Sequence, residues 1–139
     1  MIRIFQGIDL VRVAKFQQVV TRHRAFLEEI FTSLERDYCL SRLAPHRHLA
    51  GRFAVKEACL KALGHGLSSN GIDRVLSEIE VVSGAHGPPR LVLHGWAAAL
   101  SRKKHILQRT VSISHSGDYA VAIVILVGRG PFGFSDEGF

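Results

Sequence analysis

Apolar side chains alternate along the first thirteen residues in the manner of a β-strand. One face would carry Ile2, Ile4, Ile8 and Leu10, and the other Phe5, Val11 and Val13. Because both faces are apolar, we expect residues 2–13 to form a strand that is covered on both sides. Asp9 would lie on the second face, where only Gly7 makes room beside it. A carboxylate in such a place requires either backbone N–H donors or a cation, and the pattern leaves both interpretations open.

The spacing then becomes helical. Residues 14–30 are predicted to form one helix, whose apolar stripe consists of Val13, Phe16, Val20, His23, Leu27 and Ile30. The segment Thr32-Ser-Leu-Glu35 has the pattern of a capping box, which predicts a second helix running to about Leu43 and ended by Pro45.

The stretch from Leu49 to Leu63 is predicted to be a central helix, closed by Gly64. It is apolar on nearly all sides and should be buried, although it carries four charged residues, namely Arg52, Lys56, Glu57 and Lys61. Two interpretations fit Glu57 and Lys61. They are an ordinary i,i+4 ion pair at a surface, or a carboxylate and an ammonium that hold a metal ion and a phosphate beside Ala50 and Ala54.

The second half of the chain alternates strands and turns. We predict a hairpin of two strands, at residues 78–83 and 90–94, followed by a short helix over 95–105. A strand over 110–114 comes next, and then a central strand over 119–127 that is apolar on both faces. Residues 65–71 are expected to be a loop. His115 would sit beside the turn at 116–118. We therefore expect one α+β domain over 1–127, with a mainly antiparallel sheet packed against the central helix, and a loosely held tail over 128–139.

Composition and charge narrow the class of partner. With 139 residues and 47% apolar content, the chain fits one globular domain. No apolar run reaches the ~20 residues that span a bilayer, and no signal peptide is recognisable, so we expect a cytoplasmic protein. Cys39 and Cys59 are expected to be reduced core residues. The net charge of +6 favours an anionic partner. His46 and His48 lack the companion ligands of a zinc site.

Four stretches, in order, resemble one family. They are Gly7-Ile-Asp-Leu-Val11, Arg52-Phe-Ala-Val-Lys-Glu-Ala-Cys-Leu-Lys61, Gly87-Pro-Pro-Arg-Leu-Val-Leu-His-Gly95, and Ser112-Ile-Ser-His-Ser116 followed by Tyr119-Ala-Val-Ala122. Together they resemble the holo-[acyl-carrier-protein] synthases, the short 4′-phosphopantetheinyl transferases, over nearly all of residues 1–127. The chain departs from that pattern before Asp9, where Phe-Gln-Gly-Ile replaces the usual Gly-x-Gly, and beyond Val127, where the tail has no counterpart.

The resemblance implies transfer of the 4′-phosphopantetheine arm of coenzyme A to a serine of apo acyl carrier protein, releasing 3′,5′-ADP, in support of fatty acid biosynthesis. It implies Mg²⁺, with Mn²⁺ as an alternative ion, and a homotrimer with shared active sites. In this resemblance, Asp9 and Glu57 match the metal ligands of the family. Lys61 matches a residue that contacts the pyrophosphate of coenzyme A. Arg52 and His115 match residues that contact coenzyme A phosphates.

Two further roles follow from the same resemblance. Glu57 is one candidate for the base that receives the serine proton; a metal-bound water is the other and is favoured, because a Mg²⁺-ligated carboxylate is a poor base. The docking surface for the acidic carrier protein would carry Arg12, Lys15, Arg22 and Arg24.

Two alternatives come from other classes of protein. A basic nucleic-acid-binding module would explain the positive charge, but Asp9 and Glu57 would repel phosphates unless a metal lay between them. A non-catalytic assembly protein would explain the strands with two apolar faces, but it gives no role to the charges on the central helix.

Overall fold

A three-stranded antiparallel sheet with one long helix packed against it forms the frame of the molecule. The computed structural model describes residues 1–65, 72–84 and 86–130. The sheet has the order β1-β5-β4, with β1 at Ile2–Arg12, β4 at Ile106–Ser116 and β5 at Tyr119–Arg129. The sequence correctly predicted β5 as the central strand, but β5 continues through Arg129, two residues into the segment expected to be tail, and β4 begins four residues before the expected Thr110.

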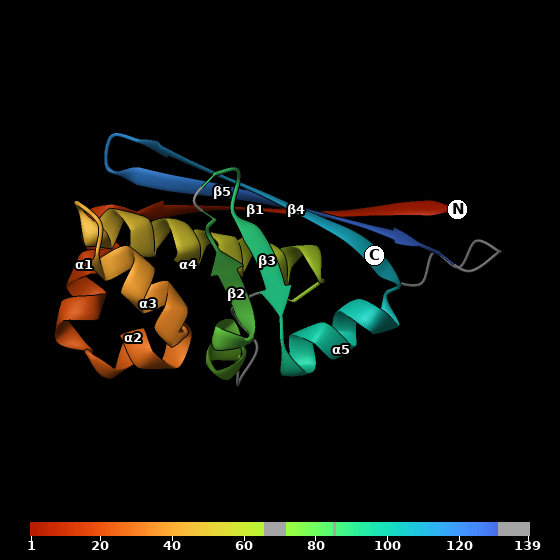
Figure 1. Cartoon of the computed structure of the whole chain (residues 1–139), viewed down its shortest axis with the longest axis horizontal. Coiled ribbons are helices and arrows are strands. Elements are labelled where there is room, and N and C mark those ends of the chain that lie inside the picture. The colour runs from red at the N-terminus through yellow and green to blue at the C-terminus, as the bar shows by residue number, and fades with distance from the viewer. Residues whose placement is uncertain (66–71, 85, 131–139) are drawn as a thin grey trace.

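The helix α4 (Pro45–Ala62) packs against β1 and β5, and the helices all lie on that side of the sheet (Figure 1). Its burial on nearly every side agrees with the apolar composition of this segment. The helix begins four residues earlier than predicted, because Ala44 adopts a left-handed conformation and Pro45 occupies the first helical position, which suits proline. His46, Arg47 and His48 therefore belong to the first turn of α4 instead of leading into it.

The segment predicted as one helix over 14–30 forms two, α1 (Val13–Arg22) and α2 (Ala25–Ile30). The chain turns at His23 and Arg24, so that Phe26 of α2 folds back onto Phe16 of α1, with ring centroids 6.3 Å apart. The capping box is confirmed, with reciprocal bonds between Thr32 and Glu35, but α3 (Ser33–Leu40) ends three residues before the expected Leu43.

A smaller layer covers the other side of α4. The 3-10 helix η1 (Ile72–Glu78) leads into the antiparallel pair β2 (Ile79–Val82) and β3 (Arg90–Leu93), which confirms the predicted hairpin. The helix α5 (Gly95–Lys103) follows and ends two residues before the expected His105. Most of the loop predicted over 65–71, and most of the predicted tail, fall outside the described residues.

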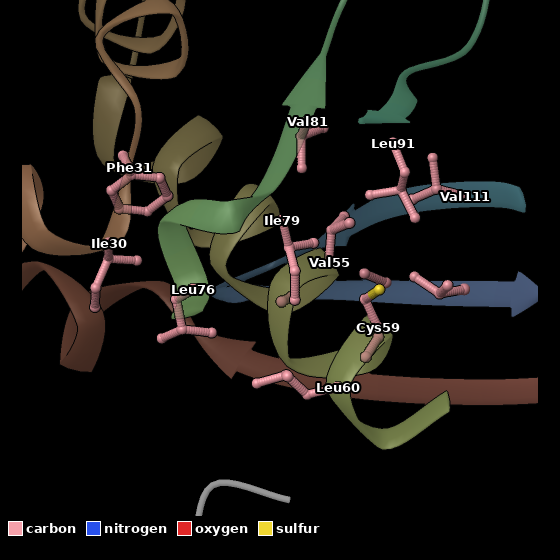
Figure 2. Packing of buried hydrophobic residues seen from close by; sticks show 14 of the residues in the cluster. Ile30, Phe31, Val55, Cys59, Leu60, Leu76, Ile79, Val81, Leu91 and Val111 are labelled. Atoms are coloured by element: carbon pink, nitrogen blue, oxygen red, sulfur yellow. The ribbon is translucent and has the colours of Figure 1, made fainter. Parts of the chain in front are cut away.

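The core lies where α4, the sheet and the hairpin meet. Figure 2 shows Val55, Cys59 and Leu60 of α4 facing Leu76, Ile79 and Val81 of the smaller layer. Cys39 and Cys59 are both buried and free, and burial raises the pKa of their thiols to about 11 and about 12. Both are therefore core residues, as expected. None of the described helices has the length and apolarity that crossing a membrane requires.

The expectation that β1 is covered on both faces is wrong for the single chain. Gly7 and Asp9 face α4 and are buried, whereas the opposite face exposes between 57% and 69% of each of its apolar residues, Ile2, Ile4, Ile8 and Leu10. The alternation predicted from the sequence is present, but within the part of the chain that the structure describes only one of the two faces has a covering layer.

Candidate active site

Asp9 of β1 and Lys61 of α4 meet between the sheet and the long helix. The Lys61 ammonium donates to Asp9 Oδ1 at 3.0 Å and to the carbonyl oxygen of Ile8 at 3.0 Å. The other carboxylate oxygen, Asp9 Oδ2, is buried and has no hydrogen-bond partner among the described residues. The interpretation in which backbone N–H groups satisfy the Asp9 carboxylate, one of the two left open above, is therefore wrong. The neutral form of the nearby Glu57 carboxyl group can donate a hydrogen bond to Asp9, so the buried oxygen becomes available to a cation once Glu57 is ionised.

Glu57 is the second carboxylate at this point, and it is only 8% exposed. Burial raises the pKa of its carboxyl group to about 8, with the nearby negative charge of Asp9 as the next cause, while Lys61 lowers it. Asp9 and Glu57 line the same groove, although 48 positions separate them in the sequence. The simple helix pair is also wrong, because the ammonium of Lys61 lies against Asp9 instead.

The backbone of β1 approaches α4 closely enough to bring the two acids together. Gly7 lies against the helix at Ala58, where even a single added carbon would collide with the carbonyl oxygen. Strand alternation then points Asp9, two residues on, to the same face as Gly7. Glu57, the neighbour of Ala58 on α4, therefore lies directly opposite.

The donor set fits Mg²⁺. This ion typically takes one or two protein carboxylates and completes an octahedron with water and substrate phosphate oxygens. Within residues 1–65, 72–84 and 86–130, no group of three or more His, Cys, Asp or Glu side chains could hold a metal. The two acids, Asp9 and Glu57, are therefore suited to an ion that brings its other ligands with it.

A groove of about 240 Å³ opens directly beside the two acids. Its floor is apolar and aromatic, and Phe16 and Phe53 stack within it with ring centroids 5.2 Å apart. Lys15 and Arg12 belong to its lining as well. The complete lining is Asp9, Leu10, Val11, Arg12, Lys15, Phe16, Val19, Phe26, Phe53 and Glu57. Sequence reasoning missed Phe26 and Phe53 as site residues, because an aromatic residue at helical spacing is typical of a core position.

A second, cationic cluster lies around the first half of α4. Arg52 is 4% exposed, its guanidinium lies over the ring of Tyr38 with Cζ 4.2 Å from the centroid, and it donates to the hydroxyl of Ser83. Its Nε has no partner among the described residues. With a rise of ~1.5 Å per residue, Arg52 lies about 7.5 Å along the helix axis from Glu57. A ligand with several phosphates could therefore contact both.

His115 of β4 lies beside the same part of α4. Its Nε2 lies 3.0 Å from the carbonyl oxygen of Arg47, and its ring packs against Gly51 of α4. His48 lies between His115 and Tyr38, since its ring centroid is 6.4 Å from that of His115 and 6.3 Å from that of Tyr38. Burial lowers the pKa of His48, and the positive charges of Arg52 and its neighbours lower it further. Sequence reasoning gave no role to Tyr38 or His48.

The four predicted docking residues occupy different environments. Arg12 ends β1 and pairs with Asp118 at 3.1 Å, in an exposed ion pair that contributes little to stability. Lys15 and Arg22 are exposed on α1, and Arg24 is exposed at the turn into α2. Of these four residues, only Arg12 and Lys15 line the apolar groove.

The fold and this site define a class of transferase that handles phosphate-bearing substrates. The sequence profile of the 4′-phosphopantetheinyl transferase superfamily matches residues 6–124, and the chain belongs to this superfamily. Within it, the chain is 38% identical over 132 residues to the holo-[acyl-carrier-protein] synthase of Moorella thermoacetica, covering 95% of this chain and 97% of that protein. It is 44% identical over 124 residues to the synthase of Syntrophotalea carbinolica, covering 88% and 94%.

Solved structures agree with these relatives. The complex of a Chronobacterium ammoniagenes acyl-carrier-protein synthase with coenzyme A superposes with a TM-score of 0.81 at 34% identity, covering 92% of this chain and 99% of that one. The Helicobacter pylori holo-[acyl-carrier-protein] synthase in complex with coenzyme A gives a TM-score of 0.71 at 30% identity, covering 87% and 98%. The mixed arrangement of helices and antiparallel sheets is therefore the one found in these synthases.

Proposed function

We propose that this protein is a holo-[acyl-carrier-protein] synthase, which transfers the 4′-phosphopantetheine arm of coenzyme A to a serine of apo acyl carrier protein and releases 3′,5′-ADP. The observation that carries the proposal is the meeting of Asp9, Glu57 and Lys61 at the end of an apolar groove. The serine oxygen loses its proton and attacks the β-phosphate, and the bond to the leaving 3′,5′-ADP breaks. The candidate acceptors of the proton are Glu57 and a water of the metal site. Such a reaction depends mainly on positioning and charge neutralisation.

Each residue of the site has a defined task. Asp9 and Glu57 hold Mg²⁺, with Mn²⁺ as an alternative; when bound, the ion neutralises phosphate charge and lowers the pKa of coordinated water. Lys61 fixes the orientation of Asp9 and is near enough to offer its ammonium to a phosphate oxygen. Arg52 and His115 bind phosphates of coenzyme A at the cationic cluster. The apolar groove excludes water from one side of the reacting phosphate.

The carrier protein docks on the surface formed by Arg12, Lys15, Arg22 and Arg24. The groove beside it supports this assignment, because its apolar floor and its two basic residues suit an amphipathic, acidic helix. The assignment also accounts for the net charge of +6. A role in fatty acid biosynthesis follows from this choice of substrate. A nucleic-acid-binding module, the alternative, leaves the two acids without a task and finds no support among the relatives.

The active protein is a homotrimer with shared sites. The support is the uncovered face of β1, where four large apolar residues stay more than half exposed, and Ile123 of β5 adds to the same face. Figure 1 shows that the helices leave this side of the sheet bare. A surface of this kind is typical of an interface between subunits.

One experiment tests reaction and metal together. The protein is incubated with apo carrier protein, coenzyme A and Mg²⁺, and the carrier is weighed by mass spectrometry. We expect a mass gain of one phosphopantetheine arm, abolished by a chelator and restored by added Mg²⁺. Transfer that persists undiminished in the chelator would overturn the metal assignment, and no mass gain under any condition would overturn the function.

A further inference from the structure

An ion pair between Glu35 of α3 and Lys56 of α4 is completely buried, and the proposed reaction does not use it. The Lys56 ammonium donates to Glu35 Oε1 at 2.7 Å, and both side chains are 0% exposed. Lys56 also lies 5.3 Å from the ring centroid of Phe31, within the apolar core. Charges removed from water in this way are costly unless every donor and acceptor is satisfied.

Every polar atom of this pair is in fact satisfied. The Lys56 ammonium donates to the carbonyl oxygens of Leu76 at 2.9 Å and Ile79 at 2.6 Å, besides Glu35. Glu35 Oε2 accepts from the backbone N–H of Val81 at 3.0 Å. The pair therefore joins α3 and α4 to the end of η1 and to β2. Figure 2 shows Ile79 of β2 beside Val55, the residue that precedes Lys56 on α4.

Arg52 depends on the same junction. It precedes Lys56 by one turn on the same side of α4. Its guanidinium lies against Tyr38, three residues after Glu35 on α3, and donates to Ser83, two residues after Val81. Tyr38 belongs to α3 and Ser83 directly follows β2, and these are the two elements that the Glu35–Lys56 pair joins to α4. With 4% exposure, Arg52 has little room to correct its position if those elements shift.

We propose that the Glu35–Lys56 pair positions Arg52 for binding coenzyme A and does not hold Asp9. Asp9 is instead held by Lys61 and by the pairing of β1 with β5. Buried ion pairs often add little net stability over apolar side chains of similar size, and in some proteins they instead fix one arrangement of their surroundings. This inference rests on the proposed function, because it takes Arg52 to be a coenzyme A contact.

A double-mutant cycle tests the inference. The affinity for coenzyme A in the presence of Mg²⁺ is measured by calorimetry for the wild type, Lys56→Met, Arg52→Ala and the double variant. We expect Lys56→Met to weaken binding by about tenfold or more, because small displacements of a phosphate-binding group are costly. In the Arg52→Ala background, Lys56→Met should cause no further loss, since it acts only through Arg52. The Mg²⁺ concentration that gives half-maximal transfer at saturating coenzyme A should stay unchanged.

Two further variants separate positioning from general loss of stability. Leu60→Ala opens a cavity on the same helix and should lower stability while leaving the affinity for coenzyme A as it is. Glu35→Leu/Lys56→Met leaves no unpaired buried charge; it should fold even if Lys56→Met does not, and should still bind coenzyme A weakly.

The outcomes are distinct. A wild type that binds no coenzyme A refutes the proposed function itself. If the wild type binds, the inference is overturned by normal binding in the Lys56→Met or the Glu35→Leu/Lys56→Met variant. It is also overturned if Lys56→Met lowers the affinity for coenzyme A by the same factor in the wild type and in the Arg52→Ala variant. A loss of affinity in Leu60→Ala as large as that in Lys56→Met would overturn it as well.

Discussion

Gly7 of β1 lies directly against the backbone of α4 at Ala58, so closely that a Cβ at Gly7 would come within 1.9 Å of the Ala58 carbonyl oxygen. The sequence suggested only that Gly7 makes room for Asp9. The structure shows that it makes room for the helix, and that the helix brings Glu57 with it. The distance between strand and helix therefore sets the distance between the two acids.

The first prediction is that Gly7→Ala destabilises the protein and disrupts the site. The added methyl group must displace backbone, which should lower the free energy of unfolding by at least about 2 kcal/mol. Mg²⁺ affinity should fall as well, because α4 and β1 move apart. Urea unfolding and metal titration measure the two effects. Gly84→Ala is the matched control, because its Cβ would meet nothing nearer than 3.7 Å. Equal behaviour of the two variants would show that the close approach is unimportant.

The second prediction concerns the carboxylates themselves. Asp9→Asn and Glu57→Gln keep the size of each side chain but remove a metal ligand, so transfer to the carrier protein should slow by about 100-fold or more. The unfolding midpoint of the metal-free protein should not fall with Glu57→Gln, since the buried carboxyl already favours its neutral form. Glu28→Gln, on the exposed surface of α2, serves as the control. A near-normal Mg²⁺-dependent rate in either site variant would contradict the metal assignment.

The third prediction is a pH dependence that follows from the pKa of Glu57, raised from 4.5 to about 8. Between these two values the metal-free folded protein binds a proton that the unfolded chain has released. Its stability should therefore fall as pH rises through this window and level off above about pH 8. Because Mg²⁺ must displace that proton, its affinity should rise over the same window. Urea unfolding in chelator measures the first effect as the difference in stability between the wild type and Glu57→Gln, because His48 and the other titrating groups contribute to both proteins. A difference that stays constant across the window would refute the shift.

The sequence was sufficient for those elements whose cause is local. The alternation in β1 and the capping box of Thr32 and Glu35 depend on neighbouring residues, and both are present in the structure. The motifs that carry the family resemblance also identified Asp9, Glu57 and Lys61 before their proximity could be known. Spacing alone still favoured the wrong partner for Lys61, because residues four apart on a helix are always neighbours.

What the sequence could not supply depends on contacts between distant segments. The turn at His23 has no glycine or proline to mark it, and it forms because Phe26 packs back onto Phe16. Glu35 and Lys56 lie 21 positions apart, so their pairing is invisible to periodicity. The exposed face of β1 looked like a core face for the same reason: a pattern records apolarity but not the layer that covers it.

The fourth prediction tests the docking surface. Lys15→Glu places a negative charge at the rim of the apolar groove, where it should repel an acidic carrier protein. We expect KM for the apo carrier to rise by about tenfold, with kcat nearly unchanged and with a weaker dependence on salt than the wild type shows. Lys103→Glu, exposed on α5, changes the net charge equally and is the control. A similar rise in KM for both variants would mean that net charge, and not this surface, attracts the carrier.

The fifth prediction concerns assembly. Ile8 is 57% exposed on the bare face of the sheet, between Ile4 and Leu10. Ile8→Lys should leave the single chain folded, since the described residues leave more than half of this side chain exposed, but it would bury a charge in any interface formed there. Light scattering should therefore report trimers for the wild type and monomers for the variant, with transfer activity lost alongside assembly. Leu43→Lys, at a residue that is 94% exposed between α3 and α4, should remain trimeric and active. A wild-type monomer with full activity would refute the trimer, because each site would then be complete within one chain.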